Sequence, residues 1–311
     1  MHEITHRFVD VGGVRMHVAE SGAGPLVLLL HGFPEGWYSW RHQLVALAEA
    51  GFHAVAPDQR GYGRTSKPSA VADYTMLHLV GDVVGLVDAL GEDQAVVVGH
   101  DWGAAVAWHT ALLRPDRVRG VAGLSVPFRP RGPVAPLSTV PSGFYLAHFQ
   151  EPGVADAELA ADPRDFLQRI LYGASGDAPE RSTMVVPPGG TFVDIWPRPD
   201  RLPGWLTAAD LDTYAGEFAD GFTGGLNWYR NLDRNWELTA AWHSAKIQPR
   251  ALFMIGDRDP VLSFNRVDTL AGAVPNLARS LTVAGAGHWI QQERPDLVSG
   301  ELAEFAASSR Q

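Results

Sequence analysis

The stretch Ala-Val-Val-Val-Gly-His-Asp-Trp-Gly-Ala (residues 95–104) decides the fold, because it joins a strand to a helix through a turn that only small residues permit. The apolar run 95–98 predicts a buried strand, and Trp102–Leu113 has the spacing of a helix. Small residues stand two positions before Asp101 and two and three positions after it. This spacing is typical of a sharp turn that pushes its central side chain outward.

Asp101, at the centre of that turn, is a candidate nucleophile. In most turns of this kind the central residue is Ser, which needs a base before it can attack. A carboxylate is already ionised at neutral pH, so it suits displacement at an sp³ carbon and would form an ester with its substrate. The simpler interpretation is that Asp101 only caps the following helix. The small residues on both sides and a histidine further along the chain favour the nucleophile.

Strand and helix patterns alternate on both sides of the turn. A hairpin is expected at the N-terminus, over residues 5–11 and 14–20. The remaining expected strands are 25–30, 53–57, 118–126, 251–255 and 280–283, and the remaining helices are 40–50, 75–90, 264–273 and 295–307. This alternation predicts a parallel sheet with helices on both faces. It stops over 128–245, which is proline-rich and then helical, so we predict a core of residues 1–127 and 246–311 with an inserted helical cap of 128–245.

The composition is that of a globular protein. The 311 residues are 46% hydrophobic and 19% charged, which argues against wholesale disorder. A net charge of −10 without a Lys/Arg cluster argues against nucleic-acid binding, and the absence of cysteine excludes disulfides, thiolate zinc sites and Cys nucleophiles. The polar start and the short apolar runs predict no signal peptide and no membrane span. We therefore expect a cytoplasmic protein, and the oligomeric state stays open, with a homodimer as one option.

Two loops in the last part of the chain supply a candidate base and a candidate acid. His288 lies on a glycine-rich loop after the last expected strand, where it can point over the sheet edge and act as a general base. The order nucleophile, acid, histidine favours an acid in the loop after strand 251–255, which contains Asp257 and Asp259. We choose Asp259, because Asp257 is closer to the strand end, where hydrogen bonds of a turn or cap are expected.

The loop His31-Gly32-Phe33-Pro34 is a candidate oxyanion hole. The backbone N–H groups of Phe33 and Trp102 are expected to face one point. There they would hold the negative charge that forms when water attacks the ester of Asp101. His31 itself is expected to hydrogen-bond within its loop.

The aromatic residues near these motifs suit an apolar pocket. Trp37, Trp228 and Trp289 lie on or near the motif loops and are candidates for binding the substrate. The His, Asp and Glu spacings do not form a metal ligand set, and no nicotinamide or flavin motif is visible. We therefore expect neither a metal nor another cofactor.

Six stretches of the chain match motifs of one known family. Four lie in the expected core: HGFPEGWYSWR (31–41), DQRGYGRTSKP (58–68), GHDWG (99–103) and GHWIQQE (287–293). Two lie in the expected cap: FQEPG (149–153) and LNWYRN (226–231). In these motifs the chain resembles the α/β-hydrolase family, and within it the soluble epoxide hydrolases of actinobacteria, similar to the mycobacterial A-type enzymes. The resemblance implies an α/β-hydrolase fold, with a mostly parallel eight-stranded sheet, flanking helices and an all-helical cap.

The resemblance also implies two further site residues and a substrate. Tyr145 and Tyr229 stand where the family carries its ring-opening tyrosines. Negative charge builds on the epoxide oxygen as the ring opens, and a phenol with a pKa near ~10 can donate a proton to it. The implied substrates are a small apolar epoxide and water, and the implied product is a vicinal diol.

Other functions were weighed against this one. Haloalkane dehalogenases share the GHDWG motif, but they commonly carry Asn or Glu where this chain has Phe33, which offers no side-chain donor to a halide. Fluoroacetate-type dehalogenases are expected to carry Arg where this chain has Trp102.

A non-catalytic ligand-binding protein is disfavoured because every catalytic part has a candidate. A serine esterase is disfavoured because Ser125 falls within an expected strand and Ser263 follows the acid turn. The physiological role stays open between lipid-epoxide turnover, detoxification and biosynthesis.

Overall fold

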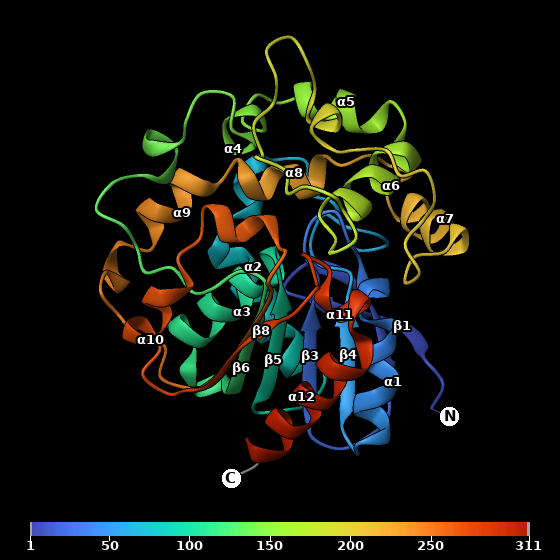
Figure 1. Cartoon of the computed structure of the whole chain (residues 1–311). Coiled ribbons are helices and arrows are strands. Elements are labelled where there is room, and N and C mark those ends of the chain that lie inside the picture. The colour runs from blue at the N-terminus through green and yellow to red at the C-terminus, as the bar shows by residue number, and fades with distance from the viewer. Residues whose placement is uncertain (1, 310–311) are drawn as a thin grey trace.

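The structure, a computed structural model that describes residues 2–309, contains one eight-stranded sheet (Figure 1). The strands lie in the order β1-β2-β4-β3-β5-β6-β7-β8, and β2 pairs antiparallel with β1 and β4 while the other pairs are parallel. Their bounds are β1 Thr5–Val11, β2 Val14–Ser21, β3 Leu26–Leu30, β4 His53–Pro57, β5 Ala95–His100, β6 Val118–Leu124, β7 Arg250–Gly256 and β8 Leu277–Val283. The expected mostly parallel sheet of eight strands is confirmed.

Helices cover both faces of the sheet. The strand β3 shows why: Leu28 packs into an apolar cluster with α2 and α3, whereas Val27 and Leu29 pack into a second cluster with α1 and α12. Successive side chains of a strand point to opposite faces, so an unbroken apolar run belongs in a sheet that is buried on both sides. The flanking helices are α1 Arg41–Glu49, α2 Met76–Ala89, α3 Trp102–Leu113, α10 Leu270–Ala273, α11 Ile290–Glu293 and α12 Pro295–Ser308.

A separate group of helices lies between β6 and β7 in the chain and covers one edge of the sheet, at the top of Figure 1. These helices are α4 Tyr145–His148, α5 Val154–Ala160, α6 Pro163–Gly173, α7 Ala208–Glu217, α8 Thr223–Tyr229 and α9 Leu232–Leu238. Short 3-10 helices span Trp37–Trp40, Val71–Tyr74, Pro115–Arg117, Pro136–Thr139, Phe192–Ile195, Ala240–Trp242, Pro260–Ser263 and Val267–Thr269. The exact division into a core and a cap of residues 128–245 stays a prediction.

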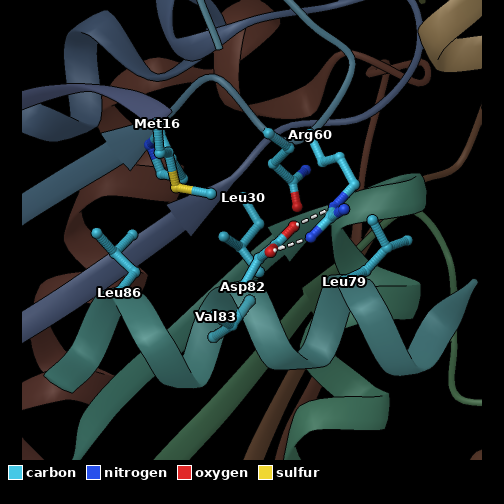
Figure 2. A pocket seen from close by; sticks show the side chains of 9 residues that line it. Met16, Leu30, Arg60, Leu79, Asp82, Val83 and Leu86 are labelled. Atoms are coloured by element: carbon cyan, nitrogen blue, oxygen red, sulfur yellow. Dashed lines mark hydrogen bonds and ion pairs between the residues drawn. The ribbon is translucent and has the colours of Figure 1, made fainter. Parts of the chain in front are cut away.

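A buried ion pair holds the loop after β4 to α2 (Figure 2). The Arg60 guanidinium donates to both oxygens of Asp82 on α2, at 2.8 and 2.6 Å, beside a small cavity. The backbone carbonyl of Arg60 accepts from the indole N–H of Trp228 at 3.1 Å. Trp228 is the neighbour of Tyr229 on α8. This hydrogen bond therefore fixes the position of Tyr229, a predicted site residue of the cap, relative to the core.

Four expected boundaries are wrong by two residues or more. The strand expected at 280–283 begins at Leu277, and the strand expected at 95–98 ends at His100. The segment expected to be helical over 264–273 begins only at Val267, as a 3-10 turn over Val267–Thr269 that continues into α10 at Leu270–Ala273. Phe264 has φ −135° and its ring packs against Phe144, 5.4 Å away between ring centres. This contact with the cap outweighs the local helical preference. The expected strand 118–126 ends at Leu124, because the next residue takes a positive φ of 70° that leaves the strand conformation.

None of the helices within residues 2–309 is both long enough and apolar enough to cross a membrane.

Candidate active site

Asp101 stands at the turn between β5 and α3 with φ 53° and ψ −117°, a conformation that L-residues rarely adopt. The turn is as tight as the sequence predicts. A Cβ atom on Gly99 would lie 2.0 Å from the Gly103 carbonyl oxygen, and one on Gly103 would lie 2.1 Å from the Leu30 carbonyl oxygen. Glycine is therefore sterically required at both positions, and the strained turn presents the Asp101 side chain at the carboxyl end of the strands.

The Asp101 carboxylate is held between the oxyanion loop and the histidine loop. The Phe33 N–H donates to Oδ1 at 3.0 Å, and His288 Nε2 lies 3.7 Å from Oδ2. Trp102 is the first residue of α3, so its N–H is one of the helix N-terminal groups that have no partner within the helix. His31 bonds within its own loop and to the loop after β4: Nδ1 contacts the Gly32 carbonyl at 2.8 Å and Nε2 accepts from the Gln59 N–H at 3.0 Å.

His288 and Asp259 come together on neighbouring loops. His288 Nδ1 lies 3.1 Å from Oδ1 and 3.2 Å from Oδ2 of Asp259, whose side chain is fully buried. The Val261 N–H donates to the same Oδ1 at 2.9 Å. Asp257 instead accepts from the Gly285 N–H at 2.8 Å, which is a hydrogen bond between the two loops rather than one to the histidine.

Ser125 is a site residue that the sequence analysis missed. Its Oγ lies 2.6 Å from Asp259 Oδ2 and 2.8 Å from His288 Nδ1, and its side chain is fully buried. Ser125 was expected within the strand 118–126, whereas it is the first residue after β6. A polar residue directly after a buried strand, at the same sheet edge as the nucleophile, is the signal that could have found it.

A second missed feature is a buried polar network around Glu35. This carboxylate lies 2.7 Å from His100 Nδ1 and accepts from the Gly32 N–H at 3.2 Å and from the side-chain amides of Gln291 and Gln292 at 3.1 and 3.0 Å. Burial raises the pKa of Glu35, but the His100 charge and the hydrogen bonds outweigh burial, so this pKa is lower than usual.

The His100 ring joins this network to the loop that carries His288. Its Nε2 lies 2.8 Å from the backbone oxygen of His288, so both ring nitrogens face oxygen acceptors. The Glu35–His100 pair therefore links the oxyanion loop, the nucleophile turn and the His288 loop behind the site.

His288 lies among carboxylates that favour its charged form. Burial lowers its pKa, but Asp259, followed by Asp101 and Glu35, outweighs burial and raises the pKa of His288 to about 9. At neutral pH the resting site therefore holds an imidazolium whose Nε2 lies beside the Asp101 carboxyl group.

A cavity joins these groups to the cap. Asp101, His288, Tyr145 and Tyr229 line it. The other lining residues are apolar or aromatic: Phe33, Ile170, Ala174, Met184, Phe192, Trp196, Val261, Phe264 and Trp289. The rings of Tyr145 and Tyr229 lie 5.9 Å apart, nearly perpendicular to each other. Burial, followed by the charge of Asp101, raises the pKa of both tyrosines above its usual value, so both stay protonated donors.

Comparisons with known proteins identify the family. The family model for the alpha/beta hydrolase fold matches residues 25–295. The chain is 50% identical to epoxide hydrolase A of Mycobacterium tuberculosis, with 97% of both chains covered. The chain belongs to the epoxide hydrolases of the α/β-hydrolase family. This epoxide hydrolase is also 42% identical to epoxide hydrolase 3 of Siraitia grosvenorii, over 98% of this chain and 99% of the relative.

Solved structures agree with this assignment. The epoxide hydrolase matches epoxide hydrolase A of Mycobacterium thermoresistibile with a TM-score of 0.94 and 48% identity, over 98% of both chains. It matches an epoxide hydrolase from an endophytic Streptomyces with a TM-score of 0.95 and 47% identity, over 99% of this chain and 96% of the other. The expected α/β-hydrolase fold and the resemblance to epoxide hydrolases are both confirmed.

The three candidate tryptophans of this epoxide hydrolase occupy different places. Trp289 lines the cavity. Trp37 lies outside that lining; its ring contacts His6, with ring centres 4.7 Å apart, because the loop has already turned away from the site. Trp228 is fully buried and hydrogen-bonded to Arg60. Adjacent residues on a helix point about 100° apart, so the turn of α8 that places Tyr229 in the cavity turns Trp228 away from it. Trp196, which the sequence analysis did not single out, lines the cavity instead.

The raised pKa of His288 predicts a pH-dependent stability of the epoxide hydrolase. The pKa of His288 is about 9 in the folded protein and has its ordinary value of 6.5 in the unfolded protein. Protonated His288 therefore stabilises the fold fully below pH 6.5, and this stabilisation is lost as the pH rises to about 9. The expected loss is at most about 3 kcal/mol of unfolding free energy, at about 1.4 kcal/mol per pKa unit. Urea unfolding at pH 6.5 and 9.5 measures it, with His288→Gln as the control that lacks the group. Equal pH dependence in both proteins would contradict the assignment.

Proposed function

We propose that this epoxide hydrolase converts small apolar epoxides to vicinal diols through a covalent ester on Asp101. The observation that carries the proposal is the single cavity in which a carboxylate, a histidine and two tyrosines share otherwise apolar walls. Such walls favour an uncharged substrate, and the four polar groups match the charges that epoxide opening creates and removes. The residue roles below are part of this proposal.

In the first step an oxygen of Asp101 attacks an epoxide carbon. The carbon–oxygen bond of the ring breaks, its electron pair goes to the epoxide oxygen, and a hydroxyalkyl ester forms. Tyr145 and Tyr229 hydrogen-bond that oxygen, and one of them gives it a proton. Their raised pKa values support this role, because a phenol that holds its proton in the resting site releases it only to the strongly basic alkoxide.

The charge of His288 changes between the two steps. At rest it carries a proton, which replaces the proton that the tyrosine gives up. Esterification removes the negative charge of Asp101, one of the groups that raise the pKa of His288. The histidine is therefore left neutral at the stage when a base is needed.

In the second step water gives a proton to His288 and attacks the ester carbonyl carbon. The N–H groups of Phe33 and Trp102 stabilise the oxyanion, and Asp259 stabilises the imidazolium. Collapse breaks the bond between the carbonyl carbon and the alkyl oxygen, and this leaving oxygen takes the second proton of the attacking water. The diol is released, Asp101 is again ionised, and His288 holds the first proton of that water. The sum is epoxide plus water to diol, with no proton left over.

A comparison of three substrates tests the proposed function. Styrene oxide, a haloalkane and a p-nitrophenyl ester are incubated separately with the enzyme. We expect diol from styrene oxide and no turnover of the other two. Halide release would favour the dehalogenase alternative, cleavage of the p-nitrophenyl ester would favour an esterase, and no turnover of any substrate would favour a ligand-binding protein.

Replacing either ring-opening tyrosine by phenylalanine should slow ester formation. Each single variant loses one hydrogen bond to the developing alkoxide, so we expect a loss of about 10- to 100-fold, and a far larger loss in the double variant Tyr145→Phe/Tyr229→Phe. Rapid-quench measurement of the first step checks this. Tyr74→Phe is the control, because Tyr74 is buried and donates to the Pro68 carbonyl away from the cavity. A double variant that opens the ring at the rate of this control would rule out the role.

Two other expectations stay predictions that these observations do not test: a cytoplasmic location and a homodimer. Size-exclusion chromatography with light scattering would decide the second.

A further inference from the structure

The shortest contact of His288 Nδ1 is with Ser125, not with the carboxylate. Ser125 Oγ lies 2.8 Å from Nδ1, whereas the two oxygens of Asp259 lie at 3.1 and 3.2 Å. Oγ also lies 2.6 Å from Asp259 Oδ2. We propose that Ser125 is a positioning residue. Its hydroxyl group bridges the Asp259 carboxylate and the His288 ring by one hydrogen bond to each, and so orients the ring. This inference rests on the proposed function, because it assigns Ser125 to the second, water-dependent step.

The direction of the hydrogen bonds follows from the chemistry of the groups. An ionised carboxylate only accepts, so the Ser125 hydroxyl donates its one hydrogen to Asp259. The Ser125 oxygen can then only accept a hydrogen bond from the ring, so the ring nitrogen Nδ1 must carry a hydrogen and donate it. When the ring is neutral, in the second step, this arrangement selects the tautomer with Nδ1–H and leaves Nε2, the nitrogen that faces Asp101, able to take a proton from water.

The backbone holds the hydroxyl in place. Ser125 follows β6, and its N–H donates to the Met254 carbonyl of β7 at 2.8 Å, so two central strands of the sheet position it. Its φ of 70° lies in the region that favours glycine. Glycine would suit this conformation better, yet it would lack the hydroxyl that bridges the acid and the histidine.

The remaining charges around His288 do not depend on Ser125. Asp101 faces the ring from the nucleophile turn, and Glu35 acts from the oxyanion loop. The His100 ring lies 4.8 Å from that of His288, between ring centres. Loss of the Ser125 hydroxyl would therefore leave the field on the nucleophile largely unchanged. It would remove an acceptor from Nδ1 and a donor from Asp259, which loosens the orientation of the base.

The test separates the two chemical steps in the full-length enzyme. Ser125→Gly removes the hydroxyl and suits the backbone angle, and Ser125→Ala removes it without adding flexibility. In single-turnover rapid-quench experiments with styrene oxide, we expect ester decay to slow about 10- to 100-fold in both variants, while ester formation changes less than about threefold. Ser21→Ala is the matched control, because Ser21 is a buried serine on β2 whose hydroxyl donates to the Glu3 carbonyl, far from this relay.

A spectroscopic readout distinguishes positioning from a general loss of structure. The Nδ1 proton of His288 should give a low-field NMR signal that is absent from His288→Gln, retained in Ser21→Ala and shifted or lost in Ser125→Gly. Ester decay at the wild-type rate in Ser125→Gly, or equal slowing of both steps, would overturn the proposal for Ser125 alone. If no ester forms even in the wild-type enzyme, the proposed function itself has failed.

Discussion

Replacing Asp101 by alanine or asparagine should abolish diol formation, with a loss of at least about 10⁴-fold in turnover. Asp101 is the only carboxylate among the described residues that line the cavity, and its position depends on a turn that admits no larger neighbours. Asparagine keeps the shape of the side chain and tolerates a positive φ, so it removes the charge with little strain. Steady-state diol production from styrene oxide measures the effect, and turnover above about 1% of wild type would contradict the nucleophile.

Isotope labelling tests the same claim without a mutation. A single turnover in ¹⁸O-labelled water should place the label on the Asp101 carboxylate, because water attacks the ester carbonyl rather than the epoxide. A second turnover of the recovered enzyme in ordinary water should carry the label into the diol. Direct attack of water on the epoxide would instead label the diol in the first turnover and leave residues 99–103 unlabelled.

Replacing His288 by glutamine should trap the ester. Asp101 needs no base to attack, so the first step should proceed, whereas hydrolysis should slow by about 10²- to 10⁴-fold without a base to activate water. Intact-protein mass spectrometry after incubation with styrene oxide should show the mass of one substrate added, and peptide mapping should place it on Asp101. A protein that stays unmodified would count against the two-step scheme.

A control histidine makes this result specific. His109 is a half-buried residue of α3 whose Nδ1 contacts the Ala105 carbonyl at 2.7 Å, and it does not line the cavity. His109→Gln should turn over styrene oxide without accumulating an adduct. An adduct in both variants would show that the trapped species reflects general damage to the site.

Most of the fold could be predicted because its signals are local. The run Leu26–Leu30 is apolar without a break, and such a run in a short strand suits only a sheet covered on both faces. The turn around Asp101 could be recognised for a similar reason, since its small residues are required by contacts within a few positions in sequence. The segment 264–273 could not be predicted in this way, because Phe264 is held out of a helix by rings of the cap that lie more than a hundred positions away.

The amino-acid sequence by itself determined the alternation of strands and helices, the turn around Asp101 and the loops that carry Asp259 and His288. Each of these depends on backbone sterics and burial patterns among residues that are close in the chain. Only the tertiary structure decided that Ser125 bridges the acid and the histidine, that Glu35 and His100 join three loops, and that Trp228 turns away from the cavity. Those relations depend on distances between side chains that are far apart in sequence. A difference of a few tenths of an ångström in such a distance decides whether two groups form a hydrogen bond.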